Sequence, residues 1–185
     1  MTQYYMACID VTGRDCLVVG GGRVADEKVQ GLLACGAEVT VVAPEVDDAI
    51  CALPVHVLER PFTSSDVVGR FLVIAATNDR SVNRLVSRVA DERQTLCNVA
   101  DDPELCNFIL PALVRREPIV VGVSTGGASP ALAQRLRDDI GDLIGPEHVE
   151  LAERLAALRP WAKSELGTYE ERRDFFSRLV EEALT

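Results

Sequence analysis

The residues best suited to binding a cofactor form a turn near the N-terminus, Gly20–Ala25, with the sequence Gly-Gly-Gly-Arg-Val-Ala. The turn matches the dinucleotide-binding pattern G-x-G-x-x-G, with alanine in the third glycine's place, where a small residue suffices. Glycines let the backbone approach a pyrophosphate closely, and the following helix offers free N–H groups to its oxygens. We expect Gly20, Gly22, Arg23 and Val24 to contact the cofactor.

The end of the second strand decides between NAD and NADP, because an acidic residue there normally binds the adenosine ribose. Here Pro44 and Glu45 follow that strand, and we expect both to contact the adenosine end. No arginine or lysine lies between residues 39 and 49 to bind a 2′-phosphate. The sequence therefore predicts NAD. Thr77, at the end of a later strand, is expected to line the same cleft.

Two further segments carry groups that could bind or act on a substrate. Residues 98–102 bring two adjacent carboxylates, Asp101 and Asp102, to a strand end, where turn formation is the alternative explanation. Residues 124–129 place glycines beside hydroxyls at a helix start, a pattern typical both of helix capping and of an anion-binding nest. Ligands of α/β sheets bind outside the carboxyl ends of the strands, so both segments are candidates for a substrate site.

The elements that position these residues alternate between strand and helix. Apolar residues 15–19 predict a buried strand before the glycines, helical spacing follows as far as Gly36, and residues 38–43 predict a second strand. Further strands are expected at 54–59, 71–76 and 95–99, with a helix at 81–92. This order predicts an α/β fold with a Rossmann-type doubly wound parallel sheet.

The alternation stops after Ala100. Apolar residues 108–114 and 119–124 are joined by only Arg115–Pro118, too short for a parallel crossover, which predicts an antiparallel pair. Ser129 and Pro130 begin a helix expected to end near residue 144, and the rest reads as helical, with Thr168 and Glu171 as a capping box. We expect an NAD-binding domain at 1–112, a small α+β dimerisation region at 113–145 and a helical C-terminal domain at 146–185.

Composition excludes several classes of protein. The net charge is −10, which argues against nucleic-acid binding. No apolar run approaches the ~20 residues of a membrane span, and the first ten residues do not resemble a signal peptide, so we expect a cytoplasmic protein without a membrane segment. The six cysteines and two histidines are not clustered as zinc ligands are, so no metal site is expected.

The chain resembles the precorrin-2 dehydrogenases of siroheme biosynthesis, including the N-terminal module of the fused bacterial siroheme synthases. The matching stretches lie in the same order over most of residues 15–140 and are 16–25 with Lys28, 42–45, 75–79, 97–101, 108–112 and 124–130. The resemblance implies a homodimer that interlocks through residues 113–145. It also implies a reaction in which NAD takes a hydride from precorrin-2, giving sirohydrochlorin and NADH.

The resemblance assigns the family's important aspartate to Asp101, as a general base or as an orienting group for the tetrapyrrole. We expect Asn98, Ser124, Thr125 and Gly126 to contact the substrate. Its carboxylates need cations, for which the candidates are Arg115, Arg116 and Arg135. Some family members also insert iron, and the residues leave that activity open here. Thr125 matches a serine that can be phosphorylated in the fused synthase, and its modification is equally open.

Two other functions share the glycine turn. An NAD-sensing regulatory module would respond to NAD without turnover, but such modules do not predict the block 108–130. A dehydrogenase for another small substrate would need a conventional His, Lys or Tyr near the strand ends, and none is evident.

Overall fold

The computed structural model describes residues 4–184, which divide into two compact units, the first ending at Leu110 and the second beginning at Pro111. In this part of the chain the first unit holds a five-stranded parallel sheet in the order β3-β2-β1-β4-β5. Its strands are β1 (Asp15–Val19), β2 (Glu38–Ala43), β3 (His56–Glu59), β4 (Leu72–Ala75) and β5 (Leu96–Val99). The order reverses between β1 and β4, as in doubly wound folds, and confirms the predicted fold class.

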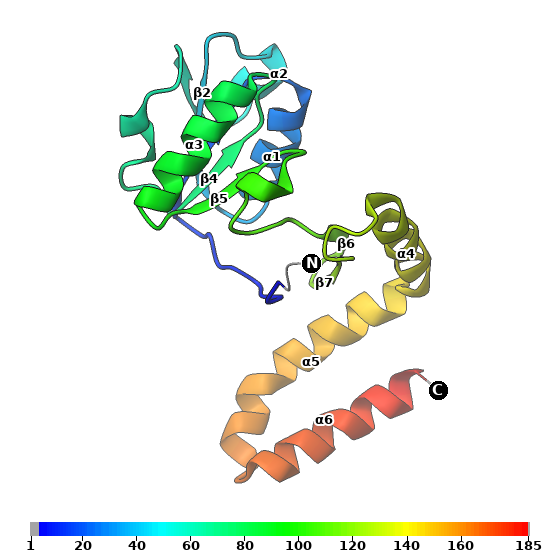
Figure 1. Ribbon diagram of the computed structural model, residues 1–185. Helices are drawn as coiled ribbons and strands as arrows, with labels where there is room; N and C mark the ends of the chain where they lie inside the picture. The colour runs from blue at the N-terminus through cyan, green and yellow to red at the C-terminus, as the bar shows by residue number, and fades with distance from the viewer. Residues whose placement is uncertain (1–3, 185) are drawn as a thin grey trace. The chain divides into compact units, whose positions relative to one another are not determined.

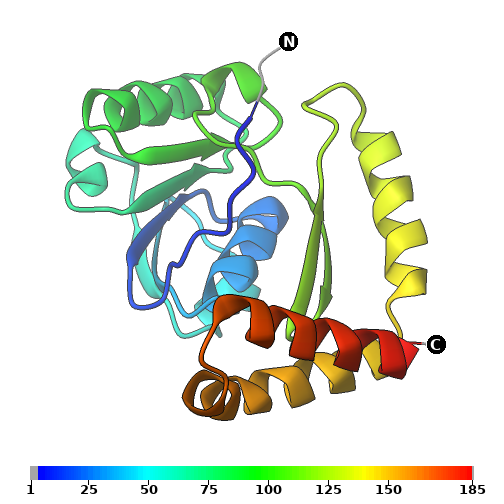
Figure 2. The same cartoon turned by 90° about the horizontal axis from the view of Figure 1, so that it is seen from below.

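Helices cover both faces of this sheet (Figures 1 and 2). On one face Cys16 and Val18 pack against the helix α1 (Arg23–Leu33), and on the other Leu17 and Val19 pack against α3 (Arg80–Glu92). Successive residues of a strand point to opposite faces, so a strand covered on both sides must be apolar throughout. Short helical segments complete the unit: α2 (Asp48–Cys51), η1 (Ser64–Val67) and η2 (Pro103–Leu105).

Gly36 ends the first helix as the sequence predicts. It has φ +75°, and its N–H donates to the Leu33 carbonyl at 2.9 Å, while the Ala37 N–H donates to the Leu32 carbonyl at 3.2 Å. This pair of hydrogen bonds is the Schellman motif, which needs a left-handed residue at that point. The chain is thereby turned directly into β2.

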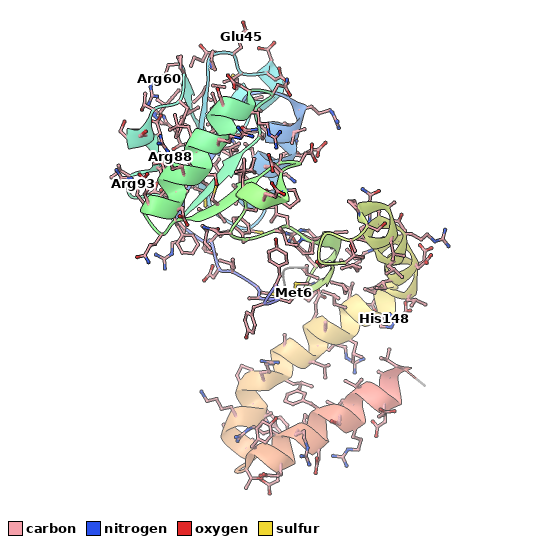
Figure 3. The ribbon with its side chains drawn as sticks, in the orientation of Figure 1. Met6, Glu45, Arg60, Arg88, Arg93 and His148 are labelled. Atoms are coloured by element: carbon pink, nitrogen blue, oxygen red, sulfur yellow. The ribbon has the colours of Figure 1, made fainter. Side chains whose placement is uncertain are left out.

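An ion pair closes the connection between β3 and β4. The guanidinium of Arg60, labelled in Figure 3, donates to both oxygens of Asp66 at 2.6 and 2.9 Å. The Thr63 N–H donates to the same carboxylate at 2.8 Å, and the Asp66 side chain is 7% exposed. The Arg60 hydrogen bonds lower the pKa of Asp66 from 3.8 to about 2. The carboxylate therefore stays charged through the neutral and mildly acidic range.

The second unit begins with the antiparallel strands β6 (Ala112–Arg116) and β7 (Ile119–Val123). The predicted pairing is confirmed, but the predicted four-residue link is wrong. Arg115 and Arg116 pair with Val120 and Ile119 inside the ladder, so the turn consists of Glu117 and Pro118 alone. Their charged side chains face water along a strand, which the apolar pattern could not reveal.

Three helices follow in the described part of this unit: α4 (Pro130–Leu143), α5 (Pro146–Glu165) and α6 (Tyr169–Leu184). Ser129 caps α4 by accepting the Leu132 N–H at 3.2 Å, as predicted. The capping box is also confirmed, because the Thr168 N–H donates to Glu171 and the Glu171 N–H donates to the Thr168 hydroxyl. Helices α5 and α6 run side by side in Figure 1, with the ring centroids of Trp161 and Phe175 5.3 Å apart.

The hairpin β6–β7 is covered on one face only. Val114 is buried beneath α4, where Gly141 lies against it. On the opposite face Leu113 is 36% exposed and Val120 is 45% exposed. An isolated two-stranded hairpin is only marginally stable in water, and α4 supplies the packing that this hairpin needs, while the face with Leu113 and Val120 stays exposed.

Candidate functional site

The glycine turn lies at the carboxyl end of the sheet, between the loops that follow β2 and β4. A Cβ on Gly20, which has φ +130°, would collide with the backbone carbonyl of Ala76. A Cβ on Gly21 would collide with the carbonyl oxygen of Glu45, and the Gly21 carbonyl accepts the Asp47 N–H at 2.8 Å. These two glycines are therefore required because three strand ends meet at this point.

A side chain could be accommodated at Gly22, although none could be at Gly20 or Gly21. A Cβ built on Gly22 meets no atom within 4 Å, and its φ of −99° suits any residue. Gly22 is the N-cap of α1, and no side chain caps that helix end. The first N–H groups of a helix lack partners within it and carry the positive end of its dipole. The residues present thus fit a pyrophosphate, and Ala25, fully buried beneath the turn, provides the close packing of helix on strand.

The surroundings of the adenosine end are acidic. Glu45 is exposed and projects from the end of β2 in Figure 3. Asp26, in the first turn of α1, has one buried carboxylate oxygen without a hydrogen-bond partner among the described residues. The Arg23 guanidinium pairs with Glu27 at 2.8 Å and is highly exposed, so it is available at a small energetic cost. At the position expected for the adenosine, the negative charge of Glu45 would oppose the 2′-phosphate of NADP.

Thr77 closes the loop that follows β4. Its hydroxyl donates to the side-chain oxygen of Asn83 at 2.7 Å, and the amide of Asn83 donates back to the Thr77 carbonyl at 3.0 Å. Asp79 caps α3 by accepting the Ser81 hydroxyl and N–H, which lowers the pKa of Asp79. The Thr77 hydroxyl therefore shapes the loop, while its contact with the cofactor stays a prediction. Sequence analysis missed Asn83, which carries no motif and is recognised only by its contacts.

The adjacent aspartates after β5 have different environments. Asp102 is partly buried and pairs with Arg80 at 3.2 Å. Asp101 is exposed, and no side chain among residues 4–184 bonds to its carboxylate. Its backbone has φ +61°, a left-handed conformation that is uncommon outside glycine and recurs at functional sites. Of the two carboxylates, only that of Asp101 is held out toward solvent and free to act.

Asn98 is buried on β5, and its amide donates to the Phe108 carbonyl at 3.1 Å. The Asn107 side chain donates to the Thr95 carbonyl and accepts the Cys97 N–H, so the chain after the Asp101 turn folds back along β5. The amide of Asn98 thus holds this returning segment. A substrate contact from Asn98 stays a prediction.

The loop 124–129 in the second unit is built around its own hydroxyls. Ser124 accepts the Gly126 N–H at 3.2 Å, and the Thr125 hydroxyl accepts the Ser129 N–H and donates to the Ser129 carbonyl, both at 3.1 Å. Gly126 and Gly127 both have positive φ. These hydrogen bonds give the hydroxyls of the loop a role in forming the turn and in starting α4. Substrate binding by Ser124, Thr125 and Gly126 stays a prediction. Arg135, a candidate for the substrate carboxylates, pairs with Asp139 at 2.9 Å.

Neither a membrane span nor a metal site is found among the described residues. No helix among them is both long and apolar enough to cross a membrane. Residues 4–184 also contain no group of three or more His, Cys, Asp or Glu side chains arranged to hold a metal ion.

Comparison with known proteins gives concordant matches. A family model described as putative NAD(P)-binding matches residues 7–112, and one described as the central region of a sirohaem biosynthesis protein matches residues 116–143. A siroheme synthase of Thioalkalivibrio sulfidiphilus is 45% identical over 99% of this chain, and one of Methylobacillus flagellatus is 44% identical over 91%. The chain spans only 38% and 37% of those two proteins.

A solved structure of a precorrin-2 dehydrogenase matches nearly the whole chain. Its TM-score is 0.84, with 27% sequence identity over 98% of this chain and 93% of that one. The similarity therefore extends through both compact units rather than being confined to the nucleotide-binding sheet.

Proposed function

We propose that this chain, which belongs to the family described as putative NAD(P)-binding through residues 7–112, oxidises precorrin-2 to sirohydrochlorin with NAD as the hydride acceptor. The observation that carries this proposal is the match of the whole chain to a precorrin-2 dehydrogenase. An NAD sensor without turnover is not favoured, because such a module would not account for the matched sirohaem region at 116–143.

NAD supplies the hydride acceptor, and the chain supplies position and proton transfer. The open backbone at Gly22 and the uncapped start of α1 hold the pyrophosphate, with Gly20, Arg23 and Val24 beside them. Pro44, Glu45 and Thr77 make the remaining contacts with the cofactor in this proposal. The acidic surroundings of Glu45 support NAD over NADP.

Asp101 carries the catalytic role in this proposal. Oxidation of the macrocycle removes a hydride and a proton, and an exposed carboxylate at a strand end beside the cofactor is suited to accept that proton or to orient the ring. The unpaired state of Asp101, against the Arg80 pairing of Asp102, supports this assignment. Asn98, Ser124, Thr125 and Gly126 are proposed to contact the tetrapyrrole, and Arg115, Arg116 and Arg135 its carboxylates.

We also propose a homodimer formed through residues 113–145. The exposed apolar face of the hairpin, with Leu113 and Val120, is the surface that a second copy would cover. Leu132 and Leu136 on α4 add exposed apolar area to the same region. A cytoplasmic location is part of this proposal.

The decisive experiment mixes purified protein with precorrin-2 and follows NADH at 340 nm. The expected result is NADH formation with NAD and at least about tenfold weaker binding of NADP. Binding of NAD without NADH formation would support the sensor instead. Adding Fe²⁺ or Co²⁺ after oxidation, and following loss of the sirohydrochlorin spectrum, tests metal insertion separately.

A further inference from the structure

The side chain of Cys106 lies inside the turn that carries Asp101. Its sulfur accepts the N–H of Val99 at 3.1 Å and lies 3.3 Å from the carbonyl oxygens of both Val99 and Asp102, within reach for its S–H to donate. The amide of Asn98 approaches the same sulfur at 3.6 Å. One half-buried side chain therefore joins the two ends of the turn.

The backbone of this turn needs such support. The Asp102 N–H reaches the Val99 carbonyl at 3.4 Å, a long hydrogen bond. Between those residues Asp101 takes φ +61°, a left-handed conformation that is uncommon for a residue other than glycine. The strained residue keeps its orientation only if neighbouring groups hold both ends of the turn.

Two neighbouring contacts fix the base of the turn but not its tip. The Ala100 N–H donates to the Ala75 carbonyl at 2.8 Å, which extends the β5–β4 ladder. The Ser87 hydroxyl donates to the Leu105 carbonyl at 2.7 Å, which anchors the short helix after the turn. Of the side chains described, Cys106 is the one bonded to the backbone at both ends of the turn.

Cys97 provides an internal comparison. It is buried on the same strand, but no hydrogen bond to its sulfur is found among residues 4–184, and burial raises its pKa to about 12. Burial also raises the pKa of Cys106, so its thiol keeps its proton near neutral pH and can donate it to a carbonyl. The two cysteines have the same side chain and lie close together in the sequence, but Cys97 is the more deeply buried, and only the Cys106 sulfur is hydrogen-bonded to the turn.

We propose that Cys106 is a positioning residue for Asp101, holding the turn so that the Asp101 carboxylate faces the substrate. This inference rests on the proposed function, in which Asp101 acts on precorrin-2. A thiol suits this position because it can accept one N–H and donate to a carbonyl. Its C–S bond is longer than the C–O bond of a serine, so a hydroxyl would reach the same backbone groups less well.

The test is a double-mutant cycle on the full-length protein, followed by NADH formation. Cys106→Ala is expected to lower kcat about tenfold, since small misplacements of a reacting group cost that much or more, with the Kd for NAD unchanged. Cys106→Ser, which keeps a donor and an acceptor, is expected to recover part of the loss. In an Asp101→Asn background Cys106→Ala is expected to change the residual rate less than twofold, because the group it positions is already gone.

Cys97→Ala is the matched control, expected to lower the Tm while leaving kcat near the wild-type value. An equal tenfold loss from Cys106→Ala in both backgrounds would overturn the proposal, as would an unchanged kcat in the wild-type background. If Cys106→Ala does not fold, Cys106→Ser takes its place in the cycle. A wild-type protein that forms no NADH refutes the proposed function, whereas an active wild type with an unaltered Cys106→Ala variant refutes this inference alone.

Discussion

Replacing each of the two neighbouring glycines, Gly21 and Gly22, by alanine separates folding from cofactor binding. A methyl group on Gly21 would collide with the Glu45 carbonyl oxygen and approach the Val46 Cα at 2.8 Å, and a backbone loop cannot rotate away as a side chain can. Forced overpacking of this kind costs about 1–3 kcal/mol. At about 2 kcal/mol, a chain of this size loses about 4–8 °C in Tm.

The methyl group on Gly22 meets open space, and the φ of −99° is ordinary for alanine. Gly22→Ala should therefore change the free energy of unfolding by less than about 0.5 kcal/mol. The same methyl group occupies the space above the helix N-terminus where the pyrophosphate must approach. Loss of one or two hydrogen bonds to a charged group, about 3 kcal/mol, corresponds to a roughly 100-fold weaker Kd for NAD.

Thermal unfolding without ligand and calorimetric titration with NAD measure the two effects on the same preparations. Gly22→Ala should retain the wild-type Tm and bind NAD more weakly. Gly21→Ala should instead have a lower Tm in the absence of ligand. Wild-type NAD affinity in Gly22→Ala would refute the placement of the pyrophosphate at α1. An unchanged Tm in Gly21→Ala would refute the close approach of the loop after β2.

Three further predictions address the active carboxylate, the buried ion pair and the dimer. Asp101→Asn should lower kcat about 100-fold, within the range for loss of a general base, and leave the Kd for NAD unchanged; wild-type turnover would remove Asp101 from the site. Asp66→Asn should lower the free energy of unfolding by about 2 kcal/mol at pH 7, since the pKa of Asp66 is depressed from 3.8 to about 2. That contribution is present above the unfolded pKa and is lost as the pH falls toward the folded one, so denaturant curves of the variant and the wild type should converge between about pH 4 and pH 2. Val120→Asp should convert the proposed dimer to a monomer in sedimentation velocity, because it puts a charge on the exposed apolar face of the hairpin; a variant that sediments like the wild type argues for a different interface.

Local sequence patterns were sufficient for the first unit because each of its signals is carried by neighbouring residues. Glycines at 20–22 and Gly36, the apolar runs between them and the helical spacing all lie within short stretches, and every predicted strand of the sheet is present. Strand registers and turns that depend on pairing between strands were harder to predict from the sequence. The link at 115–118 was predicted from apolarity, which does not register that Arg115 and Arg116 pair within the ladder at its turn end, where both side chains are exposed.

The sequence by itself determined the fold class, the glycine turn and the family, because period, turn chemistry and ordered motifs are all local. Tertiary structure alone separated Gly22 from Gly21, since the difference lies in whether the loop after β2 is close by. It also distinguished free Asp101 from Asp102, which Arg80 neutralises from 22 residues away. The same holds for Cys106, whose bonds return to Val99 on the strand before the turn. Contacts between residues distant in sequence depend on how the chain folds back on itself, and the types of the individual residues do not specify that.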